Sequence, residues 1–153
     1  MKTLFFLYFF YLSSPGSIRN TPLPFQEDSV PPREYILTLL KEADVVLRVK
    51  IKKVTLDSCK NCSSTGRLYV VQGNIIRKYQ DKKGRIKDKS IIYLSATDTA
   101  VYKKKDIIVF LNKTEGRDVE KFKKVKWNAR QATEFPYRPK TESFILSQKR
   151  PHA

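Results

Sequence analysis

The chemistry open to this chain is mainly the binding of negative charge. Arg48, Lys50 and Lys52 alternate with apolar residues in the segment 43–54, at the period of a β-strand. Such a strand buries one face in a core and presents its other, cationic face to a polyanion. Cations also cluster in three other segments, so the candidate polyanion-binding residues are Arg48, Lys50, Lys52, Lys82, Lys83, Arg85, Lys103, Lys104, Lys105, Lys121, Lys123 and Lys124.

The overall charge supports this interpretation. Lys and Arg number 31 against 15 Asp and Glu among 153 residues, which gives a formal net charge of +16. Phosphate, sulfate and acidic protein surfaces are the natural partners of such a chain. The alternative is a basic soluble surface with no dedicated ligand, because charge argues for association and not for a particular fold.

Residues that could carry out catalysis are few. The single histidine, His152, lies at the C-terminal end, and the sequence has no Gly-x-Ser-x-Gly, His-Glu-x-x-His or phosphate-loop motif. Carboxylates at the ends of predicted strands cap turns more often than they catalyse reactions, and here they are Asp44, Asp57, Asp98 and Asp106. We therefore expect a protein that is not an enzyme and that needs no metal or other cofactor.

The N-terminus has the order of a secretory signal. Lys2 is followed by an apolar run over 4–12 and by small or turn-forming residues over 13–17. The run is too short to span a bilayer as a helix. We expect a signal peptide over 1–16, cleaved near Gly16 or Ser17, with an uncleaved start as the alternative. The mature chain is then expected to be extracellular and to have no membrane span.

Secretion determines how Cys59 and Cys62 are interpreted. In an oxidising compartment they favour a disulfide across a short loop, with free thiols second and a redox or metal role a distant third. Closing so small a ring stabilises a fold by only roughly 2 kcal/mol on the chain-entropy model. Asn61 and Asn112 each open an N-x-S/T glycosylation acceptor, and Asn112 is the better candidate because it is expected to follow a strand in a polar turn.

The order of predicted elements indicates one domain. Prolines keep 17–32 extended as a lead-in, and 33–41 is a predicted short helix with an apolar face. Gly73 suggests a bulge inside a strand, and 80–89 a charged hairpin loop. The predicted strands are 44–54, 68–79, 90–95 and 106–111.

The region after residue 120 is less regular. Phe122, Val125 and Trp127 are expected to line a final strand, 134–139 to form a loop, and 144–146 to dock on the body as an apolar patch. About five strands without a βαβ rhythm predict a mainly β fold, a small antiparallel OB-fold-like barrel with one or two flanking helices. We expect this barrel over 33–130 and a C-terminal tail over 131–153.

Four segments carry a family likeness: 43–54, Tyr79 with the lysine loop after it, 102–111, and Lys126-Trp127. They resemble the netrin-like module, the OB-type barrel shared by netrins, secreted frizzled-related proteins and tissue inhibitors of metalloproteinases. The resemblance covers most of the mature chain and implies an extracellular barrel of this type. Metalloproteinase inhibitors of this fold chelate the protease zinc through an N-terminal cysteine, whereas this chain has no cysteine before Cys59.

Three functions are compared. Binding of sulfated glycosaminoglycan or of an acidic protein comes first, because it needs charge density and no specific geometry. Protease inhibition is implied by the resemblance alone. Nucleic-acid binding would need aromatic side chains that stack on bases, but secretion makes that partner unlikely and the available aromatics fit a core better: Tyr69, Tyr79, Tyr93 and Phe110.

Overall fold

The computed structural model describes residues 30–57, 68–97, 99–114 and 125–148. Helix α1 covers Arg33–Glu42 and helix α3 covers Pro139–Ser147, with a 3-10 turn at Thr99–Tyr102. The strands are β1 (Val45–Asp57), β2 (Leu68–Asp81), β3 (Ser90–Ser95), β4 (Asp106–Lys113), β5 (Trp127–Ala129) and β6 (Glu134–Pro136). The predicted signal peptide, the lead-in up to residue 29 and the segment 149–153 lie outside the described residues.

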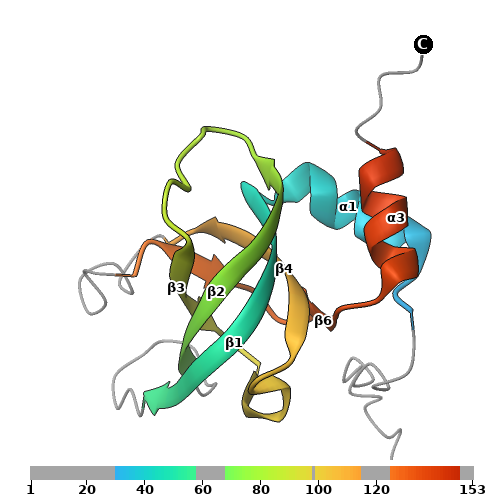
Figure 1. Cartoon of the computed structure of the whole chain (residues 1–153). Helices are drawn as coiled ribbons and strands as arrows, with labels where there is room; N and C mark the ends of the chain where they lie inside the picture. Colours follow the sequence, from blue (N-terminus) through green and yellow to red (C-terminus); the bar gives the residue numbers. More distant parts are fainter. Residues whose placement is uncertain (1–29, 58–67, 98, 115–124, 149–153) are drawn as a thin grey trace, which may run out of the picture.

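Five of the strands close into a barrel (Figure 1). The sheet runs β1-β2-β3-β5-β4, and pairing between β1 and β4 joins its two ends. All pairings are antiparallel except that of β3 with β5, which is parallel, and β6 adds to β4. The prediction of a mainly β, small OB-like barrel with flanking helices is therefore confirmed.

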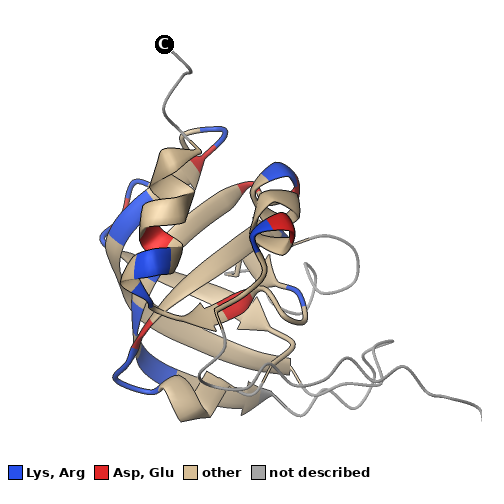
Figure 2. Cartoon of the chain, turned by 90° about the vertical axis from the view of Figure 1, so that its right-hand side faces the viewer, with Lys and Arg blue, Asp and Glu red and all other residues tan. Residues whose placement is uncertain are grey.

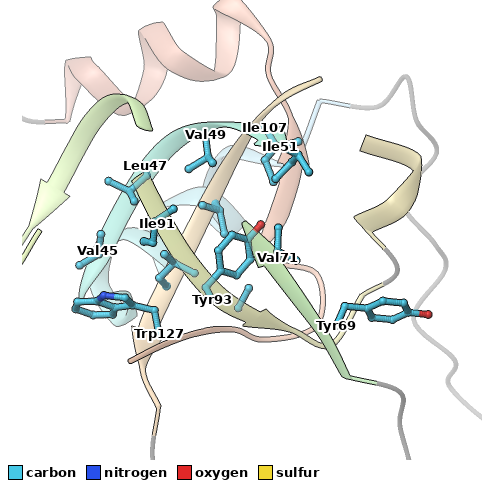
Figure 3. Close-up of a cluster of buried hydrophobic side chains, with 13 residues drawn as sticks. Val45, Leu47, Val49, Ile51, Tyr69, Val71, Ile91, Tyr93, Ile107 and Trp127 are labelled. Carbon is cyan, nitrogen blue, oxygen red and sulfur yellow. The ribbon is translucent and has the colours of Figure 1, made fainter. Parts of the chain in front are cut away.

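The barrel interior is filled by one face of each strand. Val45, Leu47, Val49 and Ile51 point inward from β1, as Figure 3 shows, and all are at most 1% exposed. Residues of the other strands meet them there, among them Tyr93 from β3. The alternation predicted for β1 is confirmed between Leu47 and Lys52, where apolar residues are buried and the intervening cations are not.

A second core lies outside the barrel, under the two helices. Both helices lie on the same side of the barrel, to the right in Figure 1. Ile36 and Leu39 of α1 pack there with Val46, which explains why two consecutive valines of β1 are buried. Ile145 of α3 is fully buried in the same cluster, so the prediction that 144–146 docks on the body is confirmed.

The C-terminal region is more ordered than its sequence indicates. The expectation of a loop over 134–139 is wrong in part, because β6 pairs with β4 at Glu134–Pro136 and α3 begins at Pro139. The strand predicted around Trp127 is β5, which starts only at Trp127 and is not the last strand; Val125 is buried as expected, and Phe122 lies outside the described residues. Within the part of the chain that the structure describes, no helix is long and apolar enough to cross a membrane.

Gly73 allows the two longest strands to cross closely. The β1–β2 register shifts between Ile51 and Lys53, opposite Gly73, which confirms the predicted irregularity. A Cβ atom at position 73 would overlap Cγ1 of Val49 and come within 2.9 Å of the carbonyl oxygen of Lys50. The side chain must therefore be absent here for β1 to bend over β2.

We expect Gly73→Val to lower the free energy of unfolding by about 1–3 kcal/mol, because the added methyl groups must displace β1. Gly84→Asn is the matched control, since Gly84 lies in open space with φ +59° and asparagine tolerates that conformation. Urea denaturation of both variants measures the difference. Equal midpoints for Gly73→Val and the parent chain would contradict the close approach.

Candidate polyanion-binding surface

The structure brings two of the predicted lysine clusters together. The N–H of Lys104 donates to the carbonyl of Ile51 at 3.0 Å, and the N–H of Ile51 donates to the carbonyl of Lys105 at 3.1 Å. In the adjoining ladder Lys50 stands opposite Asp106. The turn that precedes β4 is thereby fixed against the middle of β1, so its lysines lie beside those of the strand.

We call this group the lysine face. All of its side chains are exposed, and blue segments follow the left-hand margin of the barrel in Figure 2. Lys53 was not predicted, because strict alternation would turn it inward, but the register shift after Ile51 leaves Lys52 and Lys53 both exposed. The members of the lysine face are Lys50, Lys52, Lys53, Lys103, Lys104 and Lys105.

Arg48 has a different role from the lysines beside it. Its Nε and Nη2 donate to Oδ2 of Asp106 at 3.0 and 2.6 Å. Its guanidinium carbon lies 3.5 Å from the ring centre of Tyr137, and its side chain is only 22% exposed. This predicted polyanion-binding residue therefore already has a carboxylate partner, and Asp106 in turn does not neutralise the lysine face.

Glu142 of α3 completes the network around Arg48. Its carboxylate accepts hydrogen bonds from the hydroxyls of Tyr79 and Tyr137, both at 2.7 Å, and from Arg77 at 3.2 Å. The hydrogen bond from Tyr79, reinforced by Tyr137 and the two arginines, outweighs partial burial and holds the pKa of Glu142 below its ordinary value. Burial and the same bond raise the pKa of Tyr79. An ionised Glu142 thus fastens α3 to the barrel.

We expect Glu142→Ala to lower the free energy of unfolding by about 2–3 kcal/mol, because it leaves two arginines and two tyrosine hydroxyls without their shared acceptor. Glu34→Ala is the control, since Glu34 is an exposed glutamate of α1 whose carboxylate has no such partners. Urea denaturation at neutral pH compares the two. A Glu142→Ala variant as stable as Glu34→Ala would contradict this role.

The remaining predicted cations do not join the lysine face. In the hairpin loop after β2, the N–H of Lys82 donates to the carbonyl of Asp44 at 3.0 Å. Asp44 precedes Ile51 by seven positions, which is about 23 Å along a strand. The predicted set is therefore divided: Lys82, Lys83 and Arg85 lie toward the other end of β1, and Lys121, Lys123 and Lys124 lie outside the described residues.

The four aromatic residues considered for base stacking belong to the cores. Tyr79, Tyr93 and Phe110 are at most 1% exposed, and Tyr69 is 8% exposed. This confirms that they are core residues. Their rings are consequently not available as a platform for nucleotide bases.

The predicted modification sites are placed only in part. Asn112 lies within β4 and not after it, so the expected polar turn at this position is wrong, and Thr114 of the same acceptor is buried. The pairing of Asn112 with Asn128 extends the ladder there. Cys59, Cys62 and Asn61 lie outside the described residues, and their modification stays a prediction.

A buried carboxyl group inside the barrel was not predicted. Glu134 accepts a hydrogen bond from the Tyr93 hydroxyl at 2.7 Å and lies in short hydrogen-bonding contact with Oγ of Ser95. Ser95 Oγ also lies 3.0 Å from the carbonyl oxygen of Thr97. The Ser95 hydroxyl donates to the Glu134 carboxyl group and accepts the N–H of Thr97 at 3.0 Å. The bonds from Ser95 and Tyr93 lower the pKa of Glu134, but burial outweighs them and raises it to about 7.

This carboxyl makes stability depend on pH near neutrality. The folded chain holds a proton on Glu134 that the unfolded chain has released, so stability falls as pH rises from 4.5 towards about 7. The full effect is roughly 3 kcal/mol. We expect Glu134→Gln, which keeps an acceptor oxygen for Tyr93 and cannot ionise, to remove most of this slope. Urea denaturation between about pH 5 and pH 8 measures it; identical slopes would contradict a neutral Glu134.

No three His, Cys, Asp or Glu residues of the described ranges are grouped so that they could hold a metal ion. Asp44, which was predicted to cap a turn, accepts the N–H of Lys113 at 3.2 Å. This bond joins the start of β1 to the end of β4 across their ladder, so it is not the turn cap that was predicted for Asp44.

No protein-family model matches the sequence, and no curated protein matches it significantly. The assignment of a function therefore depends on the residues and on their geometry.

Proposed function

We propose that this protein is a secreted, non-enzymatic binding module whose lysine face associates with sulfated glycosaminoglycan or with an acidic protein surface. One observation carries the proposal: backbone pairing of the 103–105 turn with β1 gathers six exposed lysines on one face. Asp106, the carboxylate in register with Lys50, is already bound by Arg48.

The physical basis is the exchange of counterions. Exposed lysines stay hydrated and attract small anions, which a linear polyanion displaces on binding. The affinity is then expected to fall steeply as salt rises. A sulfated chain fits this surface well, because the lysines of β1 follow one another along an extended strand and those of the turn lie beside them.

The extracellular setting is supported by the signal-like N-terminus and by the resemblance to netrin-like modules. Of the two other functions, nucleic-acid binding loses support because Tyr69, Tyr79, Tyr93 and Phe110 are buried. Inhibition of metalloproteinases is supported only by the resemblance to netrin-like modules, since the chain has no cysteine before Cys59 that could chelate the protease zinc.

The test compares two triple charge reversals that change net charge equally. We expect Lys52→Glu, Lys53→Glu and Lys103→Glu together to lower markedly the salt concentration at which the full chain elutes from immobilised heparin. The matched control reverses the other cation group through Lys82→Glu, Lys83→Glu and Arg85→Glu, and we expect a smaller shift. Both should remain folded, because exposed charges contribute only about 0–1 kcal/mol each.

Two results would overturn the proposal. If the parent chain eluted with a neutral control protein, its surface would be basic without binding polyanions. If the two triple variants lost affinity equally, net charge and not the lysine face would determine binding. Thermal unfolding of each variant separates loss of binding from loss of structure.

A further inference from the structure

A pocket of about 290 Å³ opens beside the loop between β2 and β3. Its base is apolar: Ile91 and Trp127 line it and are 5% and 7% exposed. Ile86 and Ile92 extend the apolar lining towards solvent, and Ile92 is 42% exposed. A pocket of this size, lined by both apolar and polar side chains, suits a single ring system or a short chain that carries a polar group.

The walls of the pocket are fixed by hydrogen bonds. The carboxylate of Asp81 accepts the N–H groups of Arg85 and Ile86 at 2.9 and 3.0 Å, which holds the loop on one side. On the other side the carbonyl of Lys126 accepts the N–H of Thr114 at 2.9 Å. The pocket is therefore formed before any ligand arrives, which lowers the entropy cost of binding.

The charged groups at the pocket favour an anion. Arg85 and Lys126 line it, both exposed, and neither forms an ion pair with another described residue. Asp88 is the carboxylate among the lining residues and is also exposed. Two cations against one carboxylate leave a positive pocket, and a guanidinium next to an apolar surface binds carboxylate or sulfonate oxygens well.

We propose that this pocket binds a small amphipathic anion, namely a ring or short apolar chain that carries one carboxylate, sulfate or sulfonate group. The apolar part lies on Trp127 and Ile91, and the acidic group lies between Arg85 and Lys126. The lysine face contributes no residue to this pocket, so the proposal is independent of polyanion binding.

The indole group of Trp127 can report on ligand binding in this pocket. Trp127 is the only tryptophan in the sequence, so the indole N–H of the full chain gives one resonance that needs no further assignment. We expect 1-naphthalenesulfonate to shift this resonance in a saturable way. 1-Naphthalenemethanol, which has the same ring and no charge, should bind about tenfold more weakly, the size expected for the loss of a charge-assisted hydrogen bond.

Two double variants remove the same charge from different places. Arg85→Gln with Lys126→Gln should weaken 1-naphthalenesulfonate binding about tenfold or more, whereas Lys52→Gln with Lys103→Gln should leave it within about twofold. All four residues are exposed, so both variants should keep the parent chain's thermal unfolding temperature. The proposal is overturned if the indole resonance does not shift, if the neutral probe binds equally well, or if both variants weaken binding alike.

Discussion

β1 is hydrogen-bonded along both of its edges, to β2 from Val45 to Asp57 and to β4 from Val45 to Lys50. This double pairing closes the barrel and fixes which face of β1 is inside. A shift of one residue would exchange the buried valines for lysines, which no core can accept. The same pairing places the turn before β4 against Ile51. The position of the lysine face is thus a consequence of how the barrel closes.

Two carboxyl groups of opposite character attach the C-terminal region to this barrel. Glu134 of β6 is buried beside Tyr93 and is most stable when protonated, whereas Glu142 of α3 is ionised and accepts hydrogen bonds from two tyrosines. Acid weakens the contact of Glu142 and base weakens that of Glu134. The two contributions together should therefore be largest near pH 4.5, because that of Glu142 is complete only above this pH and that of Glu134 declines as pH rises from it towards about 7.

Local patterns predicted what depends on neighbours in sequence. The alternation in β1, an irregularity of the strand pairing at Gly73 and the docking of Ile145 follow from period, backbone freedom and apolarity; the structure has all three, with the extra residue on β1 opposite Gly73. Glu134 could not be found in this way, because a glutamate in a short polar segment is normally exposed. Its burial depends on the pairing of β6 with β4, a contact that no local pattern encodes. The position of the 103–105 lysines beside those of β1 was equally hidden from local patterns, because it depends on the pairing of β1 with β4.

Arginine and lysine occupy different kinds of position on the outward face of β1. Arg48 is placed where a planar guanidinium can hold Asp106 through two nitrogens and stack on Tyr137, a geometry that an ammonium group cannot reproduce. The neighbouring positions of β1 that face solvent are lysines, whose strongly hydrated charge costs little to expose and stays available for exchange with an anion. On the outward face of β1, Arg48 thus stabilises the fold, whereas Lys50 and Lys52 remain exposed to solvent. Arg48 is also the residue of this face that reaches α3, through an ion pair with Glu142 at 4.0 Å.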